Sequence, residues 1–315
     1  MFDDFSEYLQ SQGRAPATIK GYLADLAAFS RWFEQSNGIN ATGGETLEPQ
    51  AVSEAFVVAV TPSDIREYKQ FLLANKKASP ATVNRHLAAI RAWIAWARAN
   101  GLMDYNPANG IKDVEQQKLA PQWLDKRQQA ALLKELERDL AAARTEAAKR
   151  QAVRDQAMVI LFLNTGLRVS ELCGLELDDI TLSERKGEIR VMGKGEKART
   201  VPLNNTARSV LGEWLNLRPE SRQSEAFVVQ VFVGKKGEPI TPSGVHRRLS
   251  ELGRRAGVDL SAHILRHTFA KNLVDAGVTL EKVAAMLGHS SLDTTRVYTT
   301  PGKSDLEKAV RALED

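Results

Sequence analysis

Apolar positions in the first hundred residues recur at spacings of three and four, which is the pattern of helices with one buried face. The run that begins at Pro16 shows this pattern most fully. Its apolar positions are Ile19, Leu23, Leu26, Phe29 and Phe33. A shorter run over residues 3–11 places Phe5 and Leu9 four residues apart. Both segments are predicted to be helices.

Two further helices are indicated by their first residues. Thr61-Pro62-Ser63-Asp64 combines a capping hydroxyl, a proline at the first helical position and an acid three residues after the cap. Ser79-Pro80 begins another helix in the same way, and Gly101 is a suitable end for it. Residues 16–33 resemble residues 80–96 in sequence. This favours two related helical hairpins in one all-α unit, although common start signals alone would also explain the match.

The chain is predicted to divide near Asn106-Pro107, where the helical pattern ends. Residues 1–111 form the first domain, with a long glycine-containing loop at 36–60 and a short strand at 56–60. Residues 112–122 are polar, lack periodicity and contain a proline, so they are expected to form an interdomain linker. Residues 123–315 form the second domain.

The second domain has a mixed pattern. Helices are expected from about residue 125, with a surface helix or helix pair over 134–156 and a buried run at 159–163. The strand candidates are 187–192, 200–203 and 227–233. The first two form a β-hairpin with Lys194 between two glycines near its tip. From Thr241 the pattern is helical again. The predicted fold class is therefore mainly α: an all-α domain followed by an α+β domain with a small antiparallel sheet.

Composition narrows the class of protein. The 315 residues are 43% hydrophobic and 26% charged, which is close to the globular average and excludes a disordered chain. No stretch approaches 18 apolar residues without a charge, and the acidic N-terminus is unlike a signal peptide. Cys173 is the single cysteine, so no intrachain disulfide is possible, which fits a reducing cytoplasm.

Charge is distributed unevenly along the chain. The net charge of +4 is weak evidence for a nucleic-acid partner by itself. Residues 1–115 hold 11 Lys and Arg against 13 Asp and Glu, a net of −2, and the remainder holds 32 against 26, a net of +6. A bound anion is therefore expected in the C-terminal two-thirds of the chain.

Arg168 follows a glycine in Thr165-Gly166-Leu167-Arg168, where a new helix is predicted to begin. A cation at a helix N-terminus opposes the helix dipole and adds little stability. The position is favourable if the arginine and the free backbone N–H groups bind an anion together. Pairing of Arg168 with Glu171 on the surface is the alternative, and in isolation it is the better explanation.

His263, Arg266 and His267 have the spacing i, i+3, i+4, which puts all three on one face of a helix. A guanidinium can hold two phosphate oxygens, and an imidazole beside it can exchange a proton near neutral pH. A helix with one buried histidine and two exposed cations explains the motif equally well. A metal site is a poor explanation, because no acidic residue stands nearby in a ligand spacing.

Gly288-His289 follows an apolar helix, and Tyr298 comes nine residues later. Each signal is weak alone, but with Arg168, Lys194 and the histidine-arginine motif they occur in one characteristic order. In that order the sequence resembles the tyrosine recombinases of the phage integrase family, in particular its Xer-like members. The matching stretches are TGLRVSEL, GKGEKARTVPL, HILRHTFA and LGHSSLDTTRVY. In addition, SPATVNRHLAAIRAWIAWARANG resembles the last helix of that family's SAM-like core-binding domain.

The resemblance implies a mechanism. Tyr298 attacks a DNA phosphodiester to give a 3′-phosphotyrosine and a free 5′-hydroxyl, and Arg168 and Arg266 hold the non-bridging oxygens. Lys194 is expected to protonate the leaving oxygen, with Lys197 as its rival. The remaining expected roles are proton transfer with Tyr298 for His263, hydrogen bonding to the phosphate for His289, orientation of the site for Glu171 and a structural role for His267. No cofactor and no metal are expected, because covalent capture conserves the energy of the bond.

The resemblance also implies partners. We expect double-stranded DNA with a specific inverted-repeat core site, four copies of the chain on two duplexes, and an accessory or paralogous recombinase. Ser304-Asp305-Leu306-Glu307 is a capping box that begins a short amphipathic helix over 303–315. In the family this segment docks onto a neighbouring protomer, and docking onto its own domain is the alternative.

Three functions compete at this stage. Site-specific recombination is the expected activity, in integration, excision, transposition or resolution. A type IB topoisomerase shares the chemistry but acts alone, and a catalytically silent DNA-binding protein would have no need of six filled active-site positions. The simple two-domain chain points to an Xer-like or mobile-element enzyme, but the loop at 36–60 is longer than expected for a chromosome-dimer resolvase.

Overall fold

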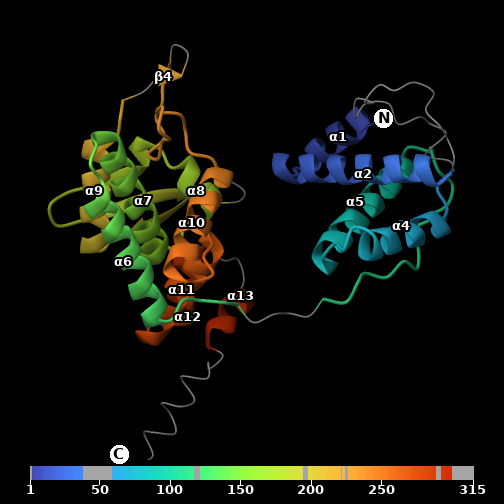
Figure 1. Ribbon diagram of the computed structural model, residues 1–315. Helices are drawn as coiled ribbons and strands as arrows, with labels where there is room; N and C mark the ends of the chain where they lie inside the picture. Colours follow the sequence, from blue (N-terminus) through green and yellow to red (C-terminus); the bar gives the residue numbers. More distant parts are fainter. Residues whose placement is uncertain are drawn as a thin grey trace, which may run out of the picture. The chain divides into compact units, whose positions relative to one another are not determined.

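The chain divides into two compact units, residues 1–118 and residues 119–315, in a computed structural model (Figure 1). The structure describes residues 2–37, 59–116, 121–193, 198–220, 222–223, 226–288 and 292–299. The division at residue 118 falls inside the segment 112–122 that was expected to be a linker. Residues 38–58, which contain most of the loop and strand expected between the first hairpins, and the helix expected at 303–315 lie outside the described residues.

All the regular secondary structure in the described residues of the first unit is helical, as predicted. Its helices are α1 (Phe2–Ser11), α2 (Pro16–Ser36), α4 (Pro62–Ala74) and α5 (Pro80–Ala99). The predicted capping box is confirmed, because the Thr61 side chain accepts from the Asp64 backbone and the Thr61 N–H donates to the Asp64 carboxylate at 2.8 Å. Helices α2 and α5 pack together, and their apolar faces form a core that includes the fully buried Phe29 and Trp93.

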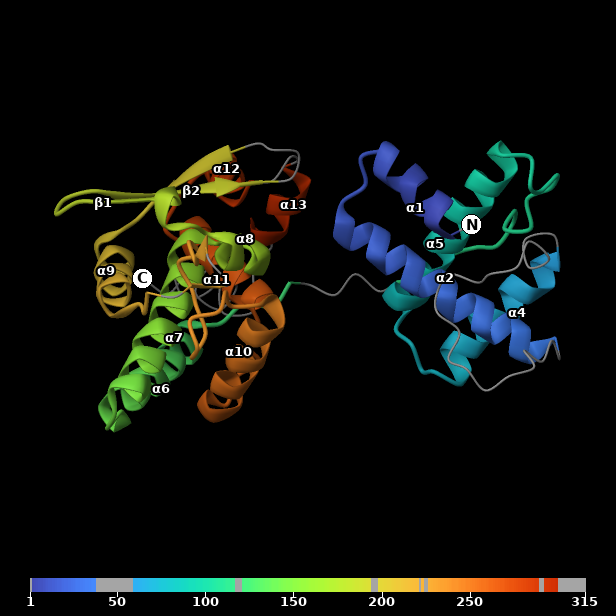
Figure 2. The same ribbon diagram turned by 90° about the horizontal axis from the view of Figure 1, so that it is seen from above.

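The second unit is built around one long buried helix. Its helices are α6 (Lys126–Ala142), α7 (Glu146–Thr165), α8 (Val169–Gly174), α9 (Asn205–Leu217), α10 (Pro242–Ala256), α11 (Ala262–Asp275), α12 (Leu280–Leu287) and α13 (Asp293–Arg296), with 3₁₀ turns η1 (Leu177–Asp179) and η2 (Val297–Thr299). Helix α7 packs against α6, α9 and α11 (Figure 2). The segment 134–156, expected on the surface, is a helix pair broken at residues 143–145, and its residues 152–155 are buried. Within the described residues, no helix has the length and apolar character needed to span a bilayer.

A three-stranded antiparallel sheet has the order β1 (Ile180–Leu182), β2 (Gly187–Met192) and β3 (Ala198–Pro202). The predicted hairpin is confirmed, since β2 pairs with β3 and Val191 lies opposite Arg199. Residues 187, 189 and 191 are buried while their neighbours are exposed, which is the alternation that predicted the strand. The connecting residues 194–197 lie outside the described part of the chain.

The strand predicted over 227–233 is wrong. Only a two-residue strand, β5 (Ala226–Phe227), forms there and pairs with β4 (Arg222–Gln223). The rest of the segment makes separate hydrogen bonds: Val229 and Val231 bond to the backbone of Leu177 and Leu175, and the Arg218 side chain donates to the carbonyls of Val228 and Gln230 at 2.6 and 2.7 Å. An apolar run satisfied in this way has the composition of a strand without its ladder.

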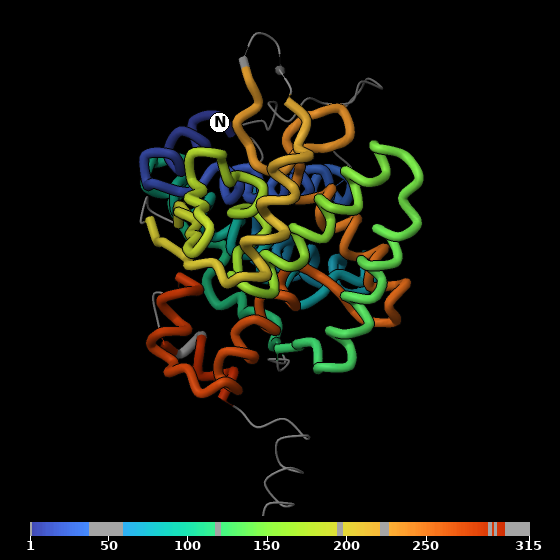
Figure 3. Tube along the Cα trace, turned by 90° about the vertical axis from the view of Figure 1, so that its left-hand side faces the viewer, coloured from blue at the N-terminus to red at the C-terminus, as the bar shows by residue number. Residues whose placement is uncertain are grey.

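A small apolar cluster joins α11, α12 and η2, separately from the main core. Its buried members are Phe269, Ala270, Val283, Leu287 and Tyr298. The orange and red segments that carry these residues gather together in Figure 3. This packing holds the segment with Tyr298 against the helix that contains His263, Arg266 and His267.

Candidate active site

Gly166 ends α7 and allows three parts of the second unit to meet. Its φ of +62° is in the left-handed region, which favours glycine. A Cβ at this position would collide with the ring of Phe269 and lie 2.8 Å from Cδ2 of Leu287. Glycine is therefore required both by conformation and by the close approach of α11 and α12. Arg168 follows two residues later.

Arg168 and Glu171 form the ion pair that was the alternative explanation of this motif. Arg168 caps α8, its Nη1 donates to Glu171 at 2.8 Å, and its backbone N–H donates to the same carboxylate at 2.7 Å. The Arg168 side chain is still 42% exposed, whereas that of Glu171 is 6% exposed. The buried Glu171 thus fixes the orientation of Arg168, and part of the Arg168 side chain remains exposed to solvent.

A second arginine, Arg199, shares the same carboxylate. Its Nη1 and Nη2 each donate to one Glu171 oxygen at 2.9 Å. Burial acts to raise the pKa of Glu171, but the hydrogen bonds from Arg199 and Arg168 and the charge of Arg199 outweigh it and lower that pKa to about 2. The sequence interpretation missed Arg199. The available signal was alternation, because residue 199 shares the inner face of its strand with the buried Val201.

Arg266 lies beneath this group and is 4% exposed. Its Nη1 donates to the Gly166 carbonyl at 2.6 Å and its Nη2 to the Leu287 carbonyl at 2.7 Å. Burial, followed by the charge of Arg168, lowers the pKa of Arg266 to about 10. The residue remains a cation at neutral pH, and the ends of α7 and α12 fix its orientation.

Tyr298 makes its hydroxyl hydrogen bond with His267. The hydroxyl and Nδ1 of His267 are 2.5 Å apart, and Tyr298 is 1% exposed. Burial raises the pKa of Tyr298, and the Arg266 charge opposes that rise. A neutral His267 would accept the hydroxyl proton at Nδ1 in this geometry.

His263 stands one helical turn from His267. The two rings are 4.1 Å apart between centroids. His263 is exposed, and burial of part of its ring, together with the Arg266 charge, lowers its pKa. The proton transfer expected between His263 and Tyr298 stays a prediction, because the contact with the hydroxyl is made by His267, for which a structural role was expected.

The structure brings together Arg168, Glu171, Arg266, His267 and Tyr298, with His263 beside them. Lys194 and His289 lie outside the described residues, so their expected roles stay predictions. The nearest described residues on either side of Lys194 are the ends of β2 and β3. His289 follows Gly288, which ends α12 with a φ of +66°. Within the described residues, no group of three or more His, Cys, Asp or Glu side chains is placed to hold a metal ion.

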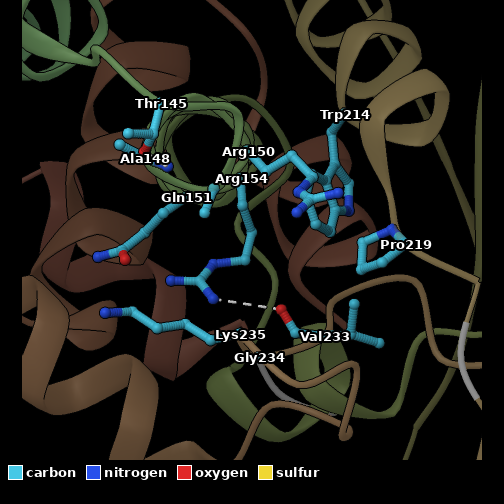
Figure 4. Close-up of a pocket in the computed structure, with 11 residues that line it drawn as sticks. Thr145, Ala148, Arg150, Gln151, Arg154, Trp214, Pro219, Val233, Gly234 and Lys235 are labelled. Carbon is cyan, nitrogen blue, oxygen red and sulfur yellow. Dashed lines mark hydrogen bonds between the residues drawn. The ribbon is translucent and has the colours of Figure 1, made fainter.

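A cavity of about 280 Å³ lies at the opposite end of α7 and is separate from this group (Figure 4). Thr145, which caps the first turn of α7, is among its lining residues. The helix has 20 residues and is about 30 Å long at 1.5 Å per residue. Arg154 points into the cavity, but its guanidinium is paired with Asp155 and donates to the Val233 carbonyl.

Family profiles match both units of the chain. The profile of the phage integrase family matches residues 122–304, and that of the phage integrase N-terminal SAM-like domain matches residues 1–97. The chain belongs to the phage integrase family. It is therefore a tyrosine recombinase, an enzyme class that acts on DNA, and the predicted family and fold class are confirmed.

Individual relatives cover almost the whole chain. The tyrosine recombinase XerC of Corynebacterium glutamicum is 32% identical over 301 residues, covering 95% of this chain and 86% of that protein. The tyrosine recombinase XerD of Listeria innocua is 31% identical over 303 residues, covering 95% of this chain and 93% of that protein.

Solved structures with the same fold include XerH bound to a palindromic difH substrate, with a TM-score of 0.69 and 23% identity over 98% of this chain and 85% of that one. The Tn1549 transposon integrase in complex with transposon right end DNA has a TM-score of 0.65 and 17% identity over 99% of this chain and 98% of that one. At these identities the likeness concerns the fold.

Proposed function

We propose that this recombinase cleaves and rejoins its DNA through Tyr298, within the cationic group formed by Arg168, Arg199 and Arg266. The observation that carries the proposal is the position of the Tyr298 hydroxyl. It is hydrogen-bonded to a histidine and lies in the field of the buried Arg266. A buried phenol beside a histidine and a cation has an acceptor for the proton that it must lose, and a phosphate can bind beside the cation.

The reaction is a transesterification. The Tyr298 oxygen forms a bond with phosphorus, the bond from phosphorus to the 5′-oxygen breaks, and the phenolic proton passes to a histidine. Lys194 supplies a proton to the departing 5′-oxygen, and His289 donates to a non-bridging oxygen. Rejoining reverses these steps with a 5′-hydroxyl of another strand, so no external energy source is consumed.

Two histidines compete as proton acceptor. His263 is the expected one, while the hydrogen bond of 2.5 Å supports His267 as the first acceptor from Tyr298. The ring contact between them supports a short relay in which His267 passes the proton toward the exposed His263. Tyr298 is 1% exposed, so this is the resting arrangement, and attack requires η2 to shift when DNA binds.

We also propose a DNA site, an oligomeric state and a cellular location for this recombinase. We place the protein on an inverted-repeat core site as a tetramer, with residues 303–315 docking onto a neighbouring protomer. Its XerC and XerD relatives favour the Xer alternative, chromosome-dimer resolution, whereas the transposon integrase shares only its fold. Since these relatives are bacterial proteins, we propose that it acts in the cytoplasm, where bacterial DNA lies.

A covalent-trapping experiment tests the proposal. Duplexes that bind the full chain are selected from a random-sequence library, and nicks are placed at successive positions so that the 5′-hydroxyl fragment dissociates after cleavage. The unaltered chain is expected to give a DNA–protein band on a denaturing gel, and Tyr298→Phe is expected to give none while still binding the duplex. Tyr68→Phe is the matched control, since Tyr68 is equally buried and also bonded to a histidine.

Two outcomes would contradict the proposal. An adduct that persists in Tyr298→Phe would move the nucleophile elsewhere. Relaxation of a supercoiled plasmid that lacks the selected site would instead favour the topoisomerase activity.

A further inference from the structure

Glu171 presents an electrostatic problem for its neighbour Arg168. A carboxylate 2.8 Å from the Arg168 guanidinium cancels the positive charge that a phosphate would need. With Arg168 alone, the pair has no net charge. With Arg199 on the same carboxylate, the three side chains have a net charge of +1. Arg199 therefore decides whether this part of the site attracts or ignores an anion.

Arg199 forms hydrogen bonds with Glu171 and with the backbone of α12. Nη1 and Nη2 form a two-pronged contact with Glu171, and Nε donates to the Met286 carbonyl at 3.0 Å. This planar fork is available to arginine and not to lysine. The side chain is 13% exposed, so its donors are turned inward to the protein.

Arg199 also touches the segment that leads to His289. A Cβ placed on Gly288 would lie 3.1 Å from Nη1 of Arg199. The arginine thus links β3, the first residues of α8 and the end of α12, three segments that are distant in the sequence. The charge of Arg199 also acts on Arg266, where it is one of the causes that lower the pKa of the Arg266 guanidinium.

We propose that Arg199 is a positioning residue for DNA cleavage: it offsets the charge of Glu171, so that Arg168 stays correctly oriented and still presents a net positive charge to the scissile phosphate. This inference rests on the proposed function. Arg199 acts through Glu171 in this account, because three of its five N–H groups donate to protein acceptors and its side chain is 13% exposed.

The test compares two scissile groups in the trapping experiment. One selected duplex carries the natural phosphodiester, and the other carries a methylphosphonate, in which a methyl group replaces a non-bridging oxygen and removes the charge. Arg199→Met should slow cleavage of the phosphodiester about 100-fold, because the net charge of the three side chains beside the phosphate falls from +1 to zero, and cleavage of the methylphosphonate less than about 10-fold. Arg199→Lys keeps the charge without the fork and should lie between Arg199→Met and the unaltered chain.

Arg218→Met is the matched control. Arg218 is also a half-buried arginine that donates to carbonyls, in its case those of Val228 and Gln230. Any slowing that comes from a loosened fold should affect the two duplexes equally. An Arg199→Met variant that cleaves the phosphodiester at the unaltered rate, or that slows both duplexes equally, would overturn the proposal.

A double variant covers the case in which Arg199→Met folds poorly. With Glu171→Gln present there is no carboxylate charge to offset, so the double variant should cleave at least as fast as Arg199→Met. A purely structural Arg199 predicts that the two losses multiply, and that result would overturn the proposal. The unaltered chain on the same gel separates the two questions: if it forms no adduct at all, the proposed function fails and this inference fails with it.

Discussion

Two tyrosines in this protein are alike in their burial and in their histidine partner, but the charged side chains beyond that histidine differ. Tyr68 in the first unit and Tyr298 in the second are each 1% exposed, and each hydroxyl meets Nδ1 of a histidine, His86 at 3.1 Å and His267 at 2.5 Å. Beyond the histidine the sites differ. His86 lies 3.3 Å from the buried Asp25, whereas Tyr298 faces Arg266.

The neighbouring charge decides what each tyrosine can do. Burial raises the pKa of both hydroxyls. At Tyr68 the charge of Asp25 adds to the rise more than Arg31 opposes it, whereas at Tyr298 Arg266 opposes the rise. The charge near Tyr298 therefore favours the phenolate and that of Asp25 near Tyr68 disfavours it, while burial keeps the pKa of both hydroxyls raised. A buried tyrosine–histidine hydrogen bond thus lies near a carboxylate in one unit and near a cation in the other, and only the second is proposed to react.

The largest expected effect comes from removing that cation. Arg266→Met should lower the rate of adduct formation by about 10²–10³-fold, because the site loses a fixed donor to the developing charge. The variant should also lose stability, since the carbonyls of Gly166 and Leu287 lose their donor. Single-turnover trapping gives the rate, and urea unfolding gives the stability. An unchanged rate would remove Arg266 from the chemistry.

The pKa of Glu171 predicts the next effect. Its folded value of about 2 lies below the ordinary 4.5, so the carboxylate stabilises the fold above pH 4.5 and this stabilisation is lost as the pH falls toward 2. The full contribution is about 3 kcal/mol, of which about 1.4 kcal/mol disappears between pH 6 and pH 3.5. Urea unfolding at both pH values should show a correspondingly weaker pH dependence in Glu171→Gln. Equal pH dependence in the two proteins would contradict the assignment.

His267→Gln should have a smaller effect on cleavage, about 10- to 100-fold, because the second histidine and water remain as proton acceptors. His86→Gln alters the corresponding histidine of the first unit and should leave the rate of the folded protein unchanged. Rates measured as a function of pH distinguish the two roles. Loss of a proton acceptor changes the shape of the pH profile, whereas a packing defect lowers the rate by the same factor at every pH. If the rate of His267→Gln decreases equally at every pH, His267 has the structural role that the sequence predicted.

The smallest expected effect belongs to Tyr68→Phe. Loss of one hydroxyl bonded to His86 should cost about 1 kcal/mol in the free energy of unfolding and nothing in the rate of cleavage. Thermal unfolding and single-turnover trapping measure the two quantities on the same sample. A slower reaction in a fully folded Tyr68→Phe variant would show that the two tyrosines are not as different as their neighbouring charges indicate.

Local rules were sufficient for much of the fold. The cap at Thr61, the alternation over 187–192 and the break at Gly166 each depend on a few neighbouring residues, and each is found where it was predicted. The strand expected at 227–233 failed because its backbone is satisfied partly by single bonds to Leu175 and Leu177 and partly by the Arg218 side chain, rather than by a continuous ladder. Hydrogen-bond partners of this kind leave no periodic pattern in the sequence.

The site was predictable as a set of residues but not as a set of contacts. Helical spacing placed His263 and His267 on one face, but it could not tell which would meet a tyrosine about 31 residues away. Arg199 was missed because its partners, Glu171 and Met286, come from motifs far before and after it. Charge balance within a buried group is a tertiary property, so it emerges only once the three segments meet.

The most direct test of the central claim is to locate the DNA on the protein. After trapping, the DNA is trimmed by nuclease, the adduct is digested with trypsin, and the modified peptide is identified by mass spectrometry. Cleavage after Arg296 and Lys303 gives the peptide Val297–Lys303, in which Tyr298 is the only tyrosine. The account predicts a nucleotide attached to this peptide, and a nucleotide on a peptide that contains Tyr68 or any other tyrosine would contradict it.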